Sequence, residues 1–190
     1  MTVNPGMMSS RYQNYKTPNG IVSALLNLEE VLAFDLDPCC SEKNIPAKRH
    51  YIEGYEDGLF EPWEGLVFCN PPYDAADSWL AKCVLESSER GAKIWALVPA
   101  RTDTRYQHDY GLGVADFAVF LKGRLSFTNS EIEKKGGSAT FPSMLLYYGS
   151  DFEEKLIKWQ KKPPYPGILT VPVSPGMVLH PTALYPALRE

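Results

Sequence analysis

Short apolar runs of strand length alternate, in the first half of the chain, with segments that repeat at helical spacing. Proline or acidic residues stop each apolar run. The runs predict three buried strands, at 31–36, 66–69 and 94–98. Two helices are predicted beside them. One begins with Thr17 as N-cap and Pro18 at its first position, and the other extends from about Asp77 to Gly91.

The second half of the chain is first strand-rich and then proline-rich. Segments 116–121, 124–127 and 144–148 predict strands, the last a candidate edge strand. Asp151 begins a short helix whose apolar side holds Phe152, Leu156 and Trp159. Beyond Lys162, seven prolines in 28 residues predict an extended tail without regular structure. The whole pattern predicts an α/β fold, a mostly parallel sheet with helices on both faces. Residues 1–150 form one domain, and residues 151–190 a C-terminal helix and tail.

Composition and charge set limits on the class of protein. Of 190 residues, 44% are hydrophobic and 22% charged, as in a single globular domain. No run approaches the roughly 20 apolar residues of a membrane span, and residues 1–11 lack the order of a secretory signal. The net charge is −4, but residues 51–80 carry seven acids and no Lys or Arg, which leaves +3 elsewhere. Charge therefore neither supports nor excludes a nucleic-acid partner.

The four cysteines form no C-x-x-C pair, which favours free thiols in a reducing cytoplasm. A zinc site built from Cys39, Cys40 and His50 fits the usual ligand spacing poorly. We therefore expect no metal.

Three polar and proline-rich clusters follow the three predicted strands. They are Asp35-Leu36-Asp37-Pro38, Asn70-Pro71-Pro72-Tyr73 and Pro99-Ala100-Arg101. Ligands of α/β sheets bind at the carboxyl ends of the strands, so these clusters predict one site.

The Asn70-Pro71-Pro72-Tyr73 turn carries most of the chemistry. The prolines have fixed φ angles and no N–H, so they hold a rigid turn. The Asn70 side chain and the Pro71 carbonyl then offer two acceptors, which suit an amino group with two N–H donors. Tyr73 offers a face on which a planar base can stack. The alternative is a proline turn followed by a core tyrosine.

The sequence resembles the phage and prophage Dam-type DNA adenine methyltransferases, which are S-adenosylmethionine-dependent enzymes of the class I, Rossmann-like fold. The matching pieces are Y-K-T-P at 15–18, F-D-L-D-P-C at 34–39, W-E-G-L-V-F-C-N-P-P-Y at 63–73, L-V-P-A-R-T-D-T at 97–104, G-R-L-S-F at 123–127 and A-T-F-P-S at 139–143. The resemblance implies transfer of a methyl group from S-adenosylmethionine to adenine N6 in duplex DNA, in a bacterial host cytoplasm. It implies no membrane partner.

The resemblance also implies a cofactor site. Asp35 or Asp37 would accept from the ribose hydroxyls, and we favour Asp37 because Pro38 fixes the following turn. The backbone at Thr17-Pro18 would approach the cofactor, and Asp57 would accept from the cofactor's adenine amine. The chain departs from most class I enzymes in having no glycine-rich loop after the first strand.

A base paired in a duplex must be flipped out before N6 can react. Tyr73 would stack on the flipped adenine, and Phe141 would form a second aromatic wall. Arg101, Arg105 and Arg124 are candidates for contacts with phosphates or base edges. Three alternatives stay open: an RNA adenine methyltransferase, a protein glutamine-amide methyltransferase, and a DNA-binding relative without catalysis.

Overall fold

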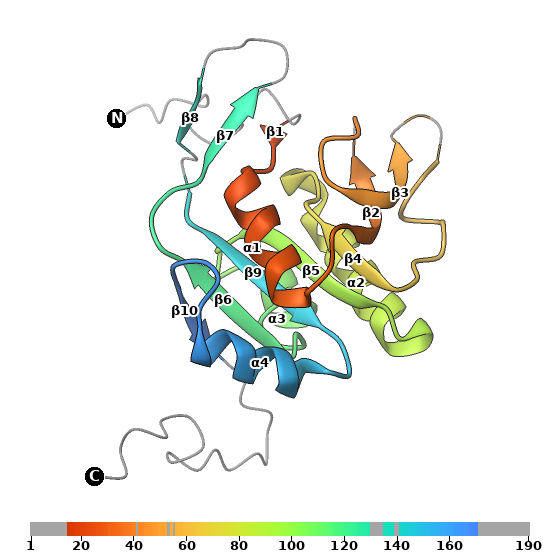
Figure 1. Ribbon diagram of the computed structural model, residues 1–190. Coiled ribbons are helices and arrows are strands. Elements are labelled where there is room, and N and C mark those ends of the chain that lie inside the picture. Colours follow the sequence, from red (N-terminus) through yellow and green to blue (C-terminus); the bar gives the residue numbers. More distant parts are fainter. Residues whose placement is uncertain are drawn as a thin grey trace, which may run out of the picture.

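The computed structural model describes residues 15–40, 42–52, 54, 56–129, 135–138 and 141–170 (Figure 1). The strands are β1 (Tyr15–Lys16), β2 (Phe34–Cys40), β3 (Ala47–Ile52), β4 (Leu66–Cys69), β5 (Lys93–Pro99), β6 (Phe117–Leu121), β7 (Ser126–Asn129), β8 (Lys135–Ser138), β9 (Ser143–Tyr148) and β10 (Gly167–Thr170). The helices are α1 (Asn19–Glu29), η2 (Tyr73–Ala75), α2 (Ala76–Arg90), α3 (Arg105–Asp109) and α4 (Phe152–Lys161).

The main sheet has seven strands in the order β10-β6-β9-β5-β4-β2-β3. The pairs β2–β3, β2–β4 and β4–β5 are parallel, whereas β5–β9, β9–β6 and β6–β10 are antiparallel. A second sheet, β1-β7-β8, is antiparallel and lies at the end of the molecule where α1 begins (Figure 1). The predicted mixed α/β class is confirmed. The prediction of a mostly parallel sheet is wrong, since only the β3-β2-β4-β5 half of the main sheet is parallel.

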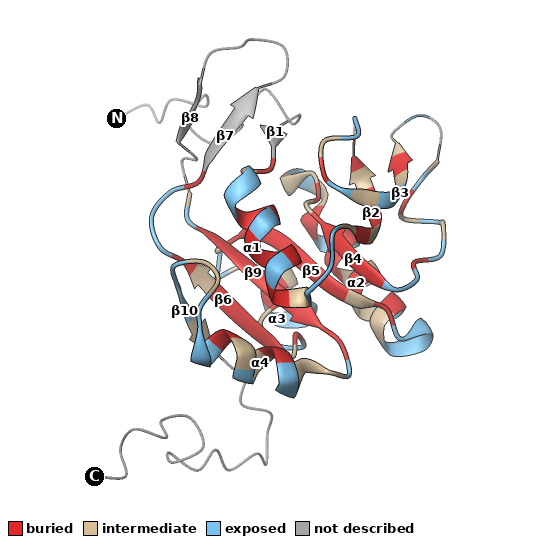
Figure 2. Cartoon of the chain, viewed as in Figure 1, coloured by how far each residue is buried: buried red, intermediate tan, exposed pale blue. Residues whose placement is uncertain are grey.

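Helices cover both faces of the main sheet, as the sequence predicts. Successive residues of β5 alternate between the two faces. Trp95 and Leu97 pack with α1 and α4, whereas Ile94 and Ala96 pack with α2. Both layers of the core are therefore closed, and Figure 2 shows the central strands as almost continuously buried.

The ends of two helices test the predicted caps. Gly91 ends α2 in the left-handed conformation, with φ 69°, as predicted. The N-cap of α1 is Pro18 and no side chain caps the helix, so the prediction that Thr17 is the N-cap is wrong. The reason is that the Thr17 hydroxyl contacts Asn70 instead, as described below.

Four strands differ clearly from the prediction in their place, their bounds or their existence. The segment 144–148 is β9, which lies between β5 and β6 and is not an edge strand. β10 forms within the proline-rich segment, because Gly167–Thr170 falls between prolines and pairs with β6. β3, an edge strand rich in charge, was not predicted, and β2 begins at Phe34 rather than near residue 31. None of the described helices is long and apolar enough to cross a membrane.

Candidate active site

The ends of β2 and β4 form the centre of the site. β2 continues to β3 on one side and β4 continues to β5 on the other, so the strand order diverges between them. Such a switch point is where open α/β sheets bind ligands. Asp37 is the middle residue of β2, and Asn70 follows β4 directly. The structure therefore brings two of the predicted clusters together, and the third follows the neighbouring strand β5.

The Asn70 side chain is held at both of its polar ends. Its Nδ2 donates to the Thr17 Oγ1 at 2.9 Å. The Tyr73 hydroxyl donates to its Oδ1 across a long 3.5 Å. Burial raises the pKa of Tyr73, so this phenol stays protonated and remains a donor. Asn70 itself is half-buried and therefore accessible from the edge of the sheet.

The turn after Asn70 is rigid for reasons visible in the backbone. Pro71 is buried, and Pro72 has φ −54° and ψ 125°. The Pro72 carbonyl accepts from the Ala75 N–H at 3.1 Å, which begins η2 and then α2. Two proline rings and the following helix thus fix the direction of the Asn70 side chain.

Asp37 carries a buried carboxylate oxygen without a partner. The residue is only 2% exposed, and its Oδ1 accepts the Cys39 N–H at 3.4 Å. Its Oδ2 has no hydrogen-bond partner within the described part of the chain. Burial raises the pKa of Asp37 to about 7, and the Cys39 bond offsets only part of this. Because an unsatisfied buried acceptor is costly, this atom fits a ligand that donates hydrogen bonds.

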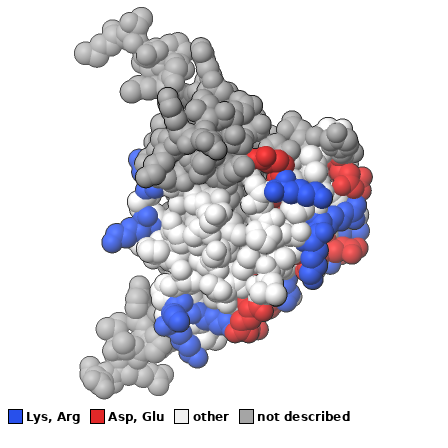
Figure 3. Space-filling view, turned by 45° about the horizontal axis from the view of Figure 1, so that its top comes forward, with Lys and Arg blue, Asp and Glu red and all other residues white. Residues whose placement is uncertain are grey.

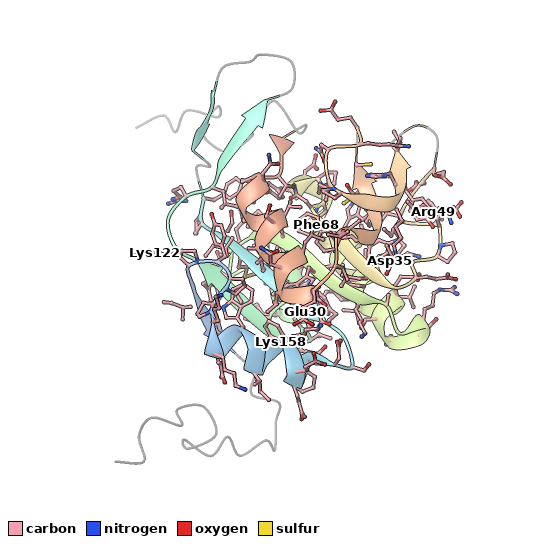
Figure 4. All side chains as sticks on the ribbon, in the orientation of Figure 1. Glu30, Asp35, Arg49, Phe68, Lys122 and Lys158 are labelled. Carbon is pink, nitrogen blue, oxygen red and sulfur yellow. The ribbon has the colours of Figure 1, made fainter. Side chains whose placement is uncertain are left out.

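Asp35 differs from Asp37 in that both of its oxygens are occupied. Oδ1 accepts from the Lys48 Nζ and Oδ2 from the Leu66 N–H, each at 2.7 Å. Burial alone would raise the pKa of Asp35, but these two bonds hold it below its ordinary value. Figure 4 shows Asp35 on the side of the molecule that also carries Arg49. Asp35 thus joins β2 to β3 and β4.

The loop that carries Asp57 packs against the C-terminal part of β2. A Cβ on Gly58 would lie 1.9 Å from the Pro38 carbonyl oxygen, so only glycine fits there. The Gly58 carbonyl accepts from the Trp63 Nε1 at 2.8 Å. Asp57 is exposed, and its Oδ1 accepts the Leu59 N–H at 2.9 Å. This loop therefore places Asp57 near the end of β2, with its carboxylate open to solvent.

Tyr73 and Phe141 meet at an angle beside Asn70. Their ring centroids are 5.2 Å apart and the rings are nearly perpendicular, at 82°. The Arg101 guanidinium lies 5.7 Å from the Phe141 centroid. The Ala100 N–H donates to the Pro142 carbonyl at 2.9 Å, which holds the two segments together. A base between parallel rings would need about 7 Å, two contacts of roughly 3.5 Å, so the rings form a corner and not a slot.

The three predicted arginines do not share one environment. Arg101 and Arg124 are exposed, and each follows a strand, β5 or β6, that ends at the same edge as β4. Neither forms an ion pair with another described residue, and the same holds for Lys122, labelled in Figure 4. Arg105 instead begins α3, on the α2 side of the sheet, and its Nε lies 3.5 Å from Asp109. In Figure 3 no described acidic group is visible beside the basic groups on the left, whereas acidic groups adjoin those on the right and at the bottom.

The cysteines near the site do not form a metal centre. Cys40 donates to the Tyr51 carbonyl and the His50 ring contacts the Ile45 carbonyl, so Cys39, Cys40 and His50 do not converge. No three metal-ligating side chains gather among the residues that the structure describes. All four cysteines are free, and the sulfurs of Cys39 and Cys69 lie 3.7 Å apart.

Sequence reasoning missed two links between the clusters. Cys39 contacts the Cys69 sulfur and the Asn70 backbone, and so joins the Asp37 turn to the Asn70 turn. Thr17 contacts Asn70, although the two residues are 53 positions apart in the sequence. Both residues lie inside motifs quoted above, but their contacts depend on strand order, for which the sequence carries no local signal.

Comparison with known proteins assigns the family. A search of curated proteins gives no match. The family model of the DNA N-6-adenine-methyltransferases (Dam) matches residues 7–164, which include every element from β1 to α4. Because this match covers most of the sequence, the chain belongs to the Dam family of DNA N-6-adenine-methyltransferases.

Proposed function

We propose that this enzyme transfers a methyl group from S-adenosylmethionine to the N6 amine of an adenine flipped out of duplex DNA. The observation that carries the proposal is the Asn70 side chain, fixed at the switch point of the sheet, where the neighbouring strand β2 carries a buried carboxylate oxygen without a partner among the described residues. The parallel half of the sheet, with helices on both faces, supports a class I, Rossmann-like methyltransferase core.

Asp37 is the residue that best fits the cofactor. Its free Oδ2 would accept from a ribose hydroxyl, a bond that favours the ionised carboxylate. Asp35 fits this role less well, because both of its oxygens already accept hydrogen bonds from Lys48 and Leu66. Asp57 would accept a hydrogen bond from the cofactor's adenine amine. The Thr17-Pro18 backbone would lie against the end of the cofactor opposite to its adenine. The cofactor would supply a methyl group activated by a positively charged sulfur.

Asn70 and Pro71 would act by orienting the nucleophile. Adenine N6 is a poor nucleophile because its lone pair is delocalised into the ring. Two bonds, from N6–H to the Asn70 Oδ1 and to the Pro71 carbonyl, would favour a tetrahedral nitrogen with its lone pair directed at the methyl group. Holding reactants in line supplies several kcal/mol of a barrier, by general estimates about 7–11 in favourable cases. No general base is needed before transfer, since the proton leaves afterwards.

The corner of Tyr73 and Phe141 would hold the flipped base. The base would stack on one ring and abut the other, since the 5.2 Å separation leaves no room between them. Stacking contributes about 1–3 kcal/mol per base, which offsets part of the cost of flipping. Arg101 and Arg124, free of ion pairs with described residues, would contact the DNA at this edge. Arg105 is the weakest of the three candidates because it lies on the α2 side of the sheet, beside Asp109.

Single-turnover methyl transfer tests the proposed role of the turn. Wild type, Asn70→Ala and Asn27→Ala are incubated with labelled S-adenosylmethionine and duplex DNA. Asn27 is exposed on α1, so its variant controls for the loss of an amide. Asn70→Ala should lower the rate by about 10² or more with unchanged cofactor affinity. Near-wild-type rates for Asn70→Ala would overturn the assignment.

A further inference from the structure

We infer that Thr17 is a positioning residue, whose side-chain oxygen holds the Asn70 amide so that Oδ1, and not Nδ2, faces the target amine. This inference rests on the proposed function, because it explains how Asn70 presents an acceptor. It differs from a cofactor contact, which is the role that the sequence motif suggests for the Thr17-Pro18 segment.

The asparagine amide is nearly symmetric in shape but not in hydrogen bonding. An asparagine side chain has an acceptor on one branch and two donors on the other, and the two branches have nearly the same shape. A half-turn of the amide would therefore present N–H donors to the N–H donors of adenine, which cannot bond. In the structure Nδ2 donates to the Thr17 Oγ1 at 2.9 Å, which leaves Oδ1 as the branch that can face the substrate, and this is the shorter of the two contacts that hold the amide. The second contact, from Tyr73, is longer at 3.5 Å and holds less strongly.

Thr17 is itself held more firmly than an ordinary loop residue. The preceding residue, Lys16, pairs with Thr128 in the small sheet. The following residue is Pro18, which restricts Thr17 to extended backbone. Pro18 caps α1, and Ile21 and Leu25 anchor that helix in the core with no exposed surface. Thr17 is only 6% exposed, and its β-branched side chain has few rotamers. The hydroxyl oxygen is thus a fixed reference point for a residue 53 positions away.

The chemical consequence separates this role from cofactor binding. Losing the Thr17 oxygen should leave the amide free to turn, so that only part of the enzyme population presents Oδ1. That change should lower kcat, because fewer enzyme molecules direct an acceptor at the target amine. It should leave the KM for the cofactor unchanged. Loss of a cofactor contact would instead raise that KM.

The test compares Thr17→Val, which keeps the shape but lacks the oxygen, with Thr17→Ser, which keeps the oxygen. Thr17→Val should lower kcat about tenfold or more, the scale of one hydrogen bond of about 1.4 kcal/mol, with cofactor KM within about twofold. Thr17→Ser should stay within about threefold of wild type. Ser88→Ala, which removes a hydroxyl bonded to the Leu85 carbonyl on α2, is the control. If Thr17→Val fails to fold, Thr17→Ala takes its place against Thr17→Ser.

A double-mutant cycle asks whether Thr17 acts through Asn70. In the Asn70→Ala background, Thr17→Val should cause no further loss of kcat, because no amide is left to orient. Additive losses would overturn the inference, as would unchanged kcat or a raised cofactor KM alone in Thr17→Val. These results leave the proposed function intact as long as wild type methylates DNA.

A readout independent of activity separates the two claims fully. The side-chain NH₂ resonance of Asn70, assigned by its loss in Asn70→Asp, should shift in Thr17→Val and stay near its wild-type position in Thr17→Ser. An unchanged resonance in Thr17→Val would overturn the inference even if wild type proved inactive.

Discussion

Replacing Asp37 with asparagine should make the fold more stable at alkaline pH, although the residue is proposed to bind the cofactor. Burial raises the pKa of this carboxyl from its ordinary 3.8 to about 7. The folded protein therefore keeps the proton to a higher pH than the unfolded chain. The wild type has its full stability below about pH 4 and loses part of it as the pH rises through 7.

The size of this loss follows from the two pKa values. At about 1.36 kcal/mol per pH unit, the interval from 3.8 to about 7 corresponds to about 4 kcal/mol once Asp37 is ionised. Asp37→Asn has nothing to ionise, so its free energy of unfolding should not show this decline. The new amide brings its own unbonded donors, at a cost of about 1–3 kcal/mol that does not change with pH. The difference between variant and wild type should therefore grow by about 4 kcal/mol from pH 4 to pH 8.

Urea denaturation at pH 4.5, 6, 7 and 8 measures this difference. Asp103→Asn, which changes an exposed aspartate, is the control. A difference for Asp37→Asn that does not change with pH would contradict this prediction, because it would mean that the folded and unfolded pKa values of Asp37 are equal. Binding of S-adenosylmethionine to the variant, measured in parallel by calorimetry, should be weaker by about 1–3 kcal/mol.

Three further predictions follow from the same contacts. Wild-type affinity for S-adenosylmethionine should rise up to tenfold per pH unit below about pH 7 and level off above it, because the bound ribose favours the ionised Asp37; an affinity independent of pH would argue against that contact. Tyr73→Ala should lose activity that a mismatched target adenine partly restores, whereas Tyr73→Phe keeps most of it; equal losses on matched and mismatched duplexes would mean that Tyr73 does not support the flipped base. The double variant Arg101→Ala/Arg124→Ala should weaken DNA binding and reduce its salt dependence in filter-binding titrations, with Arg105→Ala close to wild type; a larger effect from Arg105→Ala would place the DNA on the α3 side.

Local patterns predicted the elements that position the Asn70-Pro71-Pro72-Tyr73 turn. β4 was predicted at its observed bounds because four apolar residues end at a proline pair. α2 was predicted with its C-terminal glycine, because Gly91 alone can adopt the left-handed conformation there without strain. Both signals depend only on neighbours in the sequence.

Contacts between distant segments could not be predicted in the same way. The sequence separates Asp35 from Asp37 only by the proline that follows Asp37, whereas in the structure Asp37 is buried and Lys48 and Leu66 contact the two oxygens of Asp35. β3 is a charged edge strand, whose pattern does not alternate as a half-buried strand does. The Thr17–Asn70 contact requires α1 to begin beside the end of β4, which only the assembled sheet determines.

The identity of the methylated product is the most direct test of adenine N6 methylation in DNA. Wild-type enzyme is incubated with S-adenosylmethionine and, in separate reactions, duplex DNA, RNA of the same sequence and a glutamine-containing peptide. Each product is digested to nucleosides or amino acids and analysed by mass spectrometry. We expect N6-methyl-2′-deoxyadenosine from the duplex, abolished by Asn70→Ala, and no product from the RNA or the peptide. Methylation of the RNA or the peptide with none on the duplex would contradict the account.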